Sequence, residues 1–189
     1  MKAVLDACVL VPPVLREILL AAAAARLFQP LWSARILEEV ARAAARHGRE
    51  PEARAAVAAM VAQFPRATVA PAPGIEARLL LPDPGDIHVL ATAVSGGADA
   101  IVTYNAADFP RGILAAEGVA RRDPDGFLWE LWSHQPEAMT AAVEAARARA
   151  EAMAGAPVAR RTLLKRLRLG RLARAMEGDQ NSSQLPSRS

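Results

Sequence analysis

Four carboxylates and one amide stand near the ends of the elements that this sequence predicts, where polar side chains can gather on one surface. They are Asp6, Glu39, Asp86, Asp108 and the neighbouring Asn105. Carboxylates without basic partners repel one another, so a folded protein tolerates such a group chiefly when a divalent cation neutralises it. Oxygen ligands of this kind favour Mg²⁺ or Mn²⁺. The pattern predicts a site for one or two ions that polarise a phosphoryl oxygen and activate water, which is the chemistry of phosphodiester hydrolysis.

The residues differ in how strongly each points to a site. A charged Asp6 inside an apolar strand is costly to bury without a functional reason. Asp86 follows a turn-forming Pro-Asp-Pro-Gly segment and is suited to cap a helix, while Asp83 in that segment is expected to be a loop residue. Glu38 and Glu39 are adjacent on an amphipathic helix, so one of them is solvated, and periodicity does not decide which.

Hydrophobic periodicity predicts alternating strands and helices that would position these side chains. The predicted strands cover Ala3–Val11, Phe28–Trp32, Ala67–Ala70, Ala100–Tyr104 and Gly118–Arg121. The predicted helices between them cover Val14–Leu27, a segment from a Ser33 cap to Gly48, about Pro51–Phe64, and a segment from an Asp86 cap to Ser95. This alternation favours a parallel sheet with helices on both faces, whose functional groups collect at the carboxyl ends of the strands. We expect an α/β fold with three α/β/α layers.

The remainder of the chain is predicted to be a helical extension. A helix begins at Asp123-Pro124, a second covers Pro136–Met153, and a third covers Val158–Met176 after a break at Gly155. We therefore expect a domain over residues 1–135, a basic helical extension over 136–177, and a polar, unstructured tail over 178–189.

Charge is distributed unevenly along the chain. Residues 1–146 hold 13 basic and 17 acidic side chains, whereas residues 147–189 hold 10 and 3, so an acidic body carries a basic extension. The extension interleaves leucines with basic residues, among which nucleic-acid contacts are predicted at Arg160, Arg161, Lys165, Arg166 and Arg168. Such a helix could attract an RNA backbone, dock on the acidic body, bind a partner, or simply pack with a solvated arginine face.

Composition excludes several classes of protein. The single cysteine, Cys8, permits no internal disulfide and favours a reducing compartment. No uncharged apolar run is long enough to cross a membrane, and the N-terminus does not resemble a secretion signal. We expect a cytoplasmic protein without a membrane partner. A haloacid-dehalogenase-like phosphatase is disfavoured because position 8 is not an acid and the only lysines are Lys2 and Lys165.

Four stretches together resemble a known family. LDACVL, LWSARILEEV, DPGDIHVLATAVSGGADAIVTYNAADFP and DPDGFL, in this order over residues 1–130, are similar to PIN-domain proteins of the VapC type, the toxins of bacterial toxin–antitoxin pairs. The resemblance implies a flavodoxin-like α/β/α fold and a Mg²⁺- or Mn²⁺-dependent endoribonuclease, the toxin of a type II pair. It also implies an RNA substrate, a small cognate antitoxin that blocks the site, and a homodimer.

The resemblance assigns roles to the acidic residues. It implies catalytic positions at Asp6, Glu39, Asp86 and Asp108, and metal ligands at Asp6, Asp86, Asp108 and Asn105, and it favours Glu39 over Glu38. Relatives often carry a hydroxyl residue and an asparagine after the first aspartate, where this chain has Ala7 and Cys8. Ser33 or Thr103 could supply the missing hydroxyl.

Asn105 stands where many relatives carry a further aspartate. The substitutions at Ala7, Cys8 and Asn105 keep an alternative open, a catalytically degenerate PIN domain that binds RNA or a protein.

Overall fold

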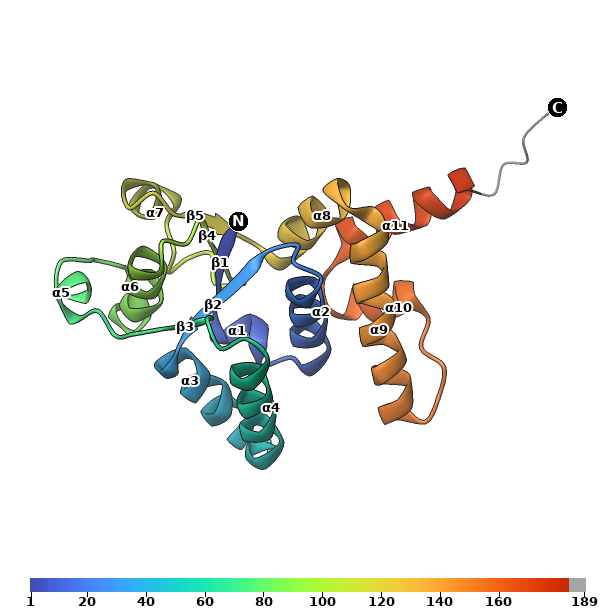
Figure 1. Cartoon of the computed structure of the whole chain (residues 1–189), viewed down its shortest axis with the longest axis horizontal. Helices are drawn as coiled ribbons and strands as arrows, with labels where there is room; N and C mark the ends of the chain where they lie inside the picture. Colours follow the sequence, from blue (N-terminus) through green and yellow to red (C-terminus); the bar gives the residue numbers. More distant parts are fainter. Residues whose placement is uncertain (184–189) are drawn as a thin grey trace.

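Five short parallel strands form the centre of the molecule (Figure 1). The computed structural model describes residues 1–183. The strands pair in the order β3-β2-β1-β4-β5, and every pairing is parallel. They are β1 (Lys2–Leu5), β2 (Gln29–Ser33), β3 (Thr68–Val69), β4 (Ala100–Val102) and β5 (Ala120–Arg122). The central strands β1 and β4 are apolar and buried on both faces, as a sheet covered by helices on both sides requires. The predicted α/β class is confirmed.

Helices cover the two faces of the sheet as separate layers (Figure 1). Connections between parallel strands are right-handed, so the direction in which the chain moves across the sheet decides which face a connecting helix covers. The chain moves from β1 through β2 to β3, and then in the opposite direction to β4 and β5. Helices that precede β3 therefore cover one face, and those that follow it cover the other. The first layer holds α2 (Pro13–Ala24), α3 (Ala34–Ala45) and α4 (Glu50–Gln63). The second holds α5 (Pro73–Glu76), α6 (Ile87–Gly96) and α7 (Arg111–Ala116). The three-layer α/β/α arrangement is therefore present.

The order of the strands reverses between β1 and β4. In a parallel α/β sheet the crevice at this switch point, beyond the carboxyl ends of the strands, is where ligands bind. Leu5 pairs with Val102 in the β1–β4 register, and the Asp6 backbone N–H donates to the Val102 carbonyl oxygen at 3.2 Å. The residues that follow the two strands, Asp6 and Thr103, are consequently brought side by side.

The first strand is shorter than its sequence predicts. The expected strand Ala3–Val11 ends at Leu5, and Ala7–Leu10 forms α1, a single helical turn. A short run of Val, Leu and Ala does not distinguish a buried strand from a buried helix by periodicity. The correction places Asp6 at the end of the strand, in the extended residue before α1, with its carboxylate at the switch point.

Four helices follow β5; the first lies within the predicted domain over residues 1–135, and the other three begin in the predicted extension. They are α8 (Pro124–His134), α9 (Pro136–Ala154), α10 (Arg160–Arg166) and α11 (Gly170–Ser183). Helix α9 packs along α2 and α8, and α11 packs on α8, so the extension continues the first helical layer (Figure 1). The T-shaped contact of Phe28 with Phe127, whose ring centroids are 5.0 Å apart, joins α8 to the body.

The single helix predicted over Val158–Met176 is wrong. The structure has two helices, α10 and α11, separated by a turn in which Arg168 adopts a left-handed φ of 58°. A residue in this conformation cannot continue a right-handed helix. Helix α11 continues to Ser183, beyond the predicted start of the tail at 178, and residues 184–189 lie outside the described residues. Among residues 1–183, no helix has the length and apolar character needed to cross a membrane.

Candidate metal centre

Asp6 is held at the end of β1 by the residue that follows β4. Its side chain is buried, and its Oδ2 accepts a hydrogen bond from the Thr103 hydroxyl at 2.6 Å. The Thr103 oxygen in turn accepts from the Asn105 backbone N–H at 2.9 Å. A charge-assisted bond to a buried carboxylate is among the stronger hydrogen bonds in proteins. It fixes one oxygen of Asp6 and leaves the other available to a ligand.

The hydroxyl group that the sequence lacks after Asp6 is therefore supplied by Thr103. Ser33, the other candidate, instead caps α3, where its Oγ accepts from the Ile36 N–H at 3.2 Å. Cys8 lies beside the same carboxylate, with its Sγ 3.1 Å from Asp6 Oδ2 and 3.3 Å from Thr103 Oγ1. Burial first, and then the negative charge of Asp6, raise the pKa of the Cys8 thiol to about 12. Cys8 thus contributes a neutral thiol to this cluster.

Three further aspartates converge in front of Asp6. Oxygens of Asp83, Asp86 and Asp108 all lie within 4.8 Å of one another. The Asn105 amide lies among them, because its Nδ2 donates to Asp86 Oδ2 at 3.2 Å and makes a short contact with Asp108 Oδ2. Asp86 occupies the capping position of α6, as predicted, but its side chain makes no capping hydrogen bond. Its carboxylate is consequently directed to the cluster.

Crowding of these acids changes the ionisation of the central one. Burial first, and then the charges of Asp6, Asp83 and Asp108, raise the pKa of Asp86 from 3.8 to about 6. The strain of like charges is what a bound cation would relieve. The three aspartates of this cluster offer only carboxylate oxygens, which fit a hard divalent cation such as Mg²⁺ or Mn²⁺, whereas Asn105 directs its Nδ2 toward Asp86 and Asp108. The donor set therefore fits the ion that the sequence predicts.

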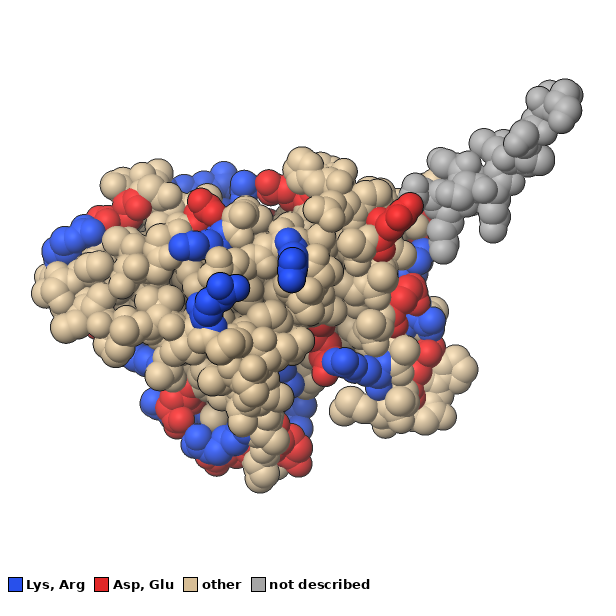
Figure 2. Space-filling view, in the orientation of Figure 1, with Lys and Arg blue, Asp and Glu red and all other residues tan. Residues whose placement is uncertain are grey.

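Glu39 and Glu38 have different surroundings. Glu39 Oε1 lies 2.9 Å from Nε2 of the buried His88 and 3.5 Å from Nε of Arg35. Glu38 points into an exposed network with Arg42 and Arg54, which lowers the pKa of its carboxyl. Figure 2 shows acidic and basic side chains mixed on the surface over α3 and α4, where this network lies. Glu39 is thus the glutamate on the site side of α3.

Glu39 is not part of the close aspartate cluster. It is connected to that cluster through α6, since His88 follows Asp86 by two residues. Both ring nitrogens of His88 are buried, and neither makes a hydrogen bond among the described residues, so the approach of Nε2 to Glu39 Oε1 is a close contact rather than a hydrogen bond. Only the tertiary structure shows that the ring of His88, on α6, meets Glu39 of α3.

Two residues of the cluster were not among the predicted ligands. Asp83 was expected to be a loop residue, and its Oδ1 does accept from the Gly85 N–H at 2.7 Å in a short 3-10 turn, Pro84–Asp86. That turn also brings Asp83 beside Asp86, and the Asp-x-x-Asp spacing was the available signal. Thr103 was considered only as a substitute hydroxyl, because its contact with Asp6 spans 97 residues of sequence.

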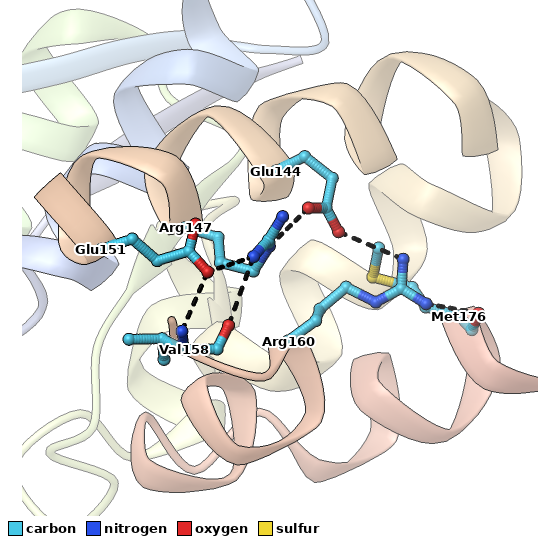
Figure 3. A network of polar contacts seen from close by, with 6 residues as sticks. All are labelled: Glu144, Arg147, Glu151, Val158, Arg160 and Met176. Carbon is cyan, nitrogen blue, oxygen red and sulfur yellow. Dashed lines mark hydrogen bonds and ion pairs between the residues drawn. The ribbon is translucent and has the colours of Figure 1, made fainter. Parts of the chain in front are cut away.

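The basic residues of the extension fall into two groups. Arg160 donates to Glu144 Oε1 and to the Met176 carbonyl oxygen, both at 3.2 Å, within a polar network that also ties α9 to Val158 (Figure 3). Arg161 pairs with Glu177 at 3.2 Å. In contrast, three basic side chains at the end of α10 and in the following turn are exposed, namely Lys165, Arg166 and Arg168. Of the five predicted nucleic-acid contacts, two are engaged within the extension.

A family model described as a PIN domain matches residues 2–107. The match covers strands β1 to β4 and includes Asp6, Glu39, Asp86 and Asn105, and it ends one residue before Asp108. No curated protein and no solved structure matches the chain. The match includes more than half of the sequence.

Proposed function

The chain belongs to the PIN-domain family, and on that premise we propose that it is a Mg²⁺- or Mn²⁺-dependent endoribonuclease. Family membership supports a nuclease-type function acting on nucleic acid. The observation that carries the proposal further is the convergence of Asp83, Asp86 and Asp108 within 4.8 Å, beside Asp6 at the switch point of the sheet. Repulsion between like charges opposes this arrangement, and a bound cation would offset that repulsion.

In the proposed mechanism Asp6, Asp86 and Asp108 would hold the ion, with Asp83 as an additional oxygen ligand. Asn105 would contribute its amide oxygen after a rotation of its amide group, because its Nδ2 faces Asp86 and Asp108 in the metal-free protein. A bound ion polarises a phosphoryl oxygen and lowers the pKa of a water molecule. Thr103 keeps the Asp6 carboxylate oriented through the 2.6 Å hydrogen bond. The protein thus contributes a fixed set of oxygens at the carboxyl ends of β1 and β4.

Glu39 serves in this proposal to orient the attacking water or to accept its proton. Its carboxylate is partly exposed and lies against His88 and Arg35 at the edge of the cluster. General bases act through a carboxylate that reaches the nucleophile directly or through one water. The contact with the buried His88 holds Glu39 toward the cluster.

We also propose that the protein is the toxin of a type II toxin–antitoxin pair, blocked by a small cognate antitoxin. The support is the resemblance of the sequence to VapC-type proteins. The proposal predicts that expression of the chain arrests growth of a bacterial host and that co-expression of a small antitoxin encoded beside it restores growth. If expression of the unaltered protein did not slow growth of the host, the toxin role would be contradicted. The nuclease proposal is tested separately, by RNA cleavage.

Cleavage of RNA by the purified protein tests the nuclease proposal. We expect single-stranded RNA to be cut in the presence of Mg²⁺ or Mn²⁺, not with EDTA, and not by Asp6→Asn. Glu52→Gln is the matched control, because it also removes one negative charge, but from an exposed position on α4. Cleavage that survives Asp6→Asn would refute the site. RNA binding without cleavage in any metal would favour the degenerate, binding-only alternative.

A further inference from the structure

The turn that joins α10 to α11 carries three exposed basic side chains. We call residues 165–168 the basic turn; Lys165, Arg166 and Arg168 are exposed in it. Among the residues whose side chains are described, no carboxylate forms an ion pair with any of the three, unlike Arg160 and Arg161 in the same helix. The charges of the basic turn are therefore available to a ligand.

Buried leucines hold the basic turn against the body. Leu164 and Leu169, which flank it, are fully buried, and Leu167 within it is half-buried. Apolar side chains at these positions turn inward, so the intervening basic side chains must point to solvent. The sequence alternates leucines with basic residues and predicts a basic amphipathic helix. In the structure this segment includes a turn whose position is fixed by the leucines and whose basic side chains are exposed.

A hydrogen bond ties the basic turn to the acidic site. The Tyr104 hydroxyl donates to the Leu167 carbonyl oxygen at 2.8 Å. Tyr104 lies between Thr103, which binds Asp6, and Asn105, which binds Asp86 and Asp108. One side chain therefore separates the acidic cluster from the basic turn.

A second set of contacts fixes the other end of the turn. The Asp125 carboxylate, at the start of α8, accepts from the backbone N–H groups of Arg171 and Leu172 at 2.8 and 3.0 Å. The Arg171 guanidinium stacks on Trp129, with its carbon 3.4 Å from the ring centroid. Both contacts involve residues of α8. This helix follows the carboxyl end of β5, and the acidic site lies at the carboxyl ends of β1 and β4 in the same parallel sheet. The position of the turn at that edge is thus determined at both ends.

The backbone of the basic turn is also strained. Arg168 has a φ of 58°, a conformation that glycine adopts more easily than any residue with a side chain. Arg168 therefore combines an unfavourable backbone conformation with a charge that no described carboxylate pairs with.

We propose that the basic turn binds the phosphate backbone of the RNA strand next to the acidic site, with Lys165, Arg166 and Arg168 each contacting phosphate. This inference rests on the proposed ribonuclease function. A polyanion that approaches a group of aspartates requires cationic groups nearby to offset the repulsion. Arginine and lysine donors suit phosphate oxygens, and such contacts carry no base specificity.

The structure offers a matched pair of variants that separates charge from stability. Arg168→Gly and Arg26→Gly each remove one exposed arginine from a left-handed backbone position, since Arg26 has a φ of 60°. Arg26 follows α2 and lines a groove with Met1 and Lys2, at the amino ends of the strands and therefore at the opposite end of the sheet from the acidic site. Both variants are expected to be at least as stable as the unaltered protein, because glycine relieves the strain at each position.

Binding of a fluorescently labelled 12-nucleotide single-stranded RNA is measured in EDTA, where no cleavage occurs, over a range of salt concentrations. Arg168→Gly should weaken binding several-fold and reduce the slope of log Kd against log salt by about 0.7, the value for one phosphate contact to a single strand. Arg26→Gly should leave the slope unchanged. The combined variant Lys165→Ala, Arg166→Ala, Arg168→Gly should reduce the slope by about 2.

Equal slopes for Arg168→Gly and Arg26→Gly would overturn the inference, as would absence of salt-dependent RNA binding by the unaltered protein. Cleavage in Mg²⁺ or Mn²⁺ separates this failure from that of the proposed function. A combined variant that still cuts and binds RNA like the unaltered protein refutes only the basic turn. A protein that binds RNA through the turn without cutting refutes only the nuclease. Polyglutamate binding is measured in the same way as a probe for acidic polypeptides. If the combined variant lost polyglutamate binding but bound RNA like the unaltered protein, the basic turn would recognise an acidic polypeptide and the inference would be wrong.

Discussion

Replacing Asp86 by asparagine should stabilise the metal-free protein while abolishing its proposed activity. The Asp86 carboxylate is half-buried and faces Asp6, Asp83 and Asp108, which raises its pKa from 3.8 to about 6. Asparagine has the same shape and can accept the hydrogen bond from Asn105, but it carries no charge. The substitution therefore removes repulsion with little loss of packing.

The magnitude follows from the pKa. A shift of about two units corresponds to about 3 kcal/mol, and solvent screening of a half-exposed group reduces this to about 1 to 1.5 kcal/mol. Because the pKa of Asp86 is higher in the folded than in the unfolded state, its proton stabilises the fold below pH 3.8, and this stabilisation is lost as pH rises through 6. Asp86→Asn should thus resemble the unaltered protein near pH 4 and exceed it in melting temperature by about 3 to 5 °C at pH 7.5.

Thermal unfolding in EDTA at pH 4 and pH 7.5 measures this difference, with Glu52→Gln as the control for loss of one exposed charge. Adding Mg²⁺ should raise the melting temperature of the unaltered protein, since a ligand of the folded state stabilises it, and should raise that of Asp86→Asn much less. If Asp86→Asn were no more stable than the unaltered protein at pH 7.5, the repulsion inferred from the aspartate cluster would be wrong.

Two pairs of substitutions test the hydrogen bond to Asp6 and the packing of the helices. Thr103→Val should cost about 2 kcal/mol in urea unfolding because Asp6 loses a charge-assisted hydrogen bond. The same change at the buried Thr92, whose hydroxyl donates to a helix carbonyl, should cost at most about 0.5 kcal/mol, and equal losses would contradict a special role for the Asp6 contact. Gly96→Ala should destabilise by about 1 to 3 kcal/mol, since its Cβ would come within 3.0 Å of core side chains. Gly112→Ala, with open space around its Cβ, should stabilise α7 by about 0.5 kcal/mol, and a similar response of both variants in unfolding experiments would refute the packing argument.

Local sequence signals were reliable where a single residue type determines a boundary. Ser33 caps α3 as predicted, and Asp123 caps α8, where it accepts from the Gly126 N–H at 2.9 Å. Gly97 ends α6 in a left-handed conformation with φ 60°. These signals act within four residues, so no tertiary contact is needed to read them.

Signals failed where two local structures have similar free energies. The apolar run after Asp6 predicts a strand where the structure has α1, and the leucine-rich segment around Arg168 predicts one helix where the structure has α10 and α11. In both cases packing selected a structure that local propensity does not favour by itself. Both errors changed which side chains face the site or the solvent.

The sequence by itself determined the alternation of strands and helices, the presence of acids after β1 and around β4, and the basic character of the extension. Only the tertiary structure decided which groups meet. It joined Thr103 to Asp6 across 97 residues, placed Asp83 with Asp86 and Asp108, and divided the basic residues into those paired internally and those left in the basic turn. The physical reason is that strand order and register, which bring distant residues together, depend on the burial of the whole sheet rather than on any local pattern.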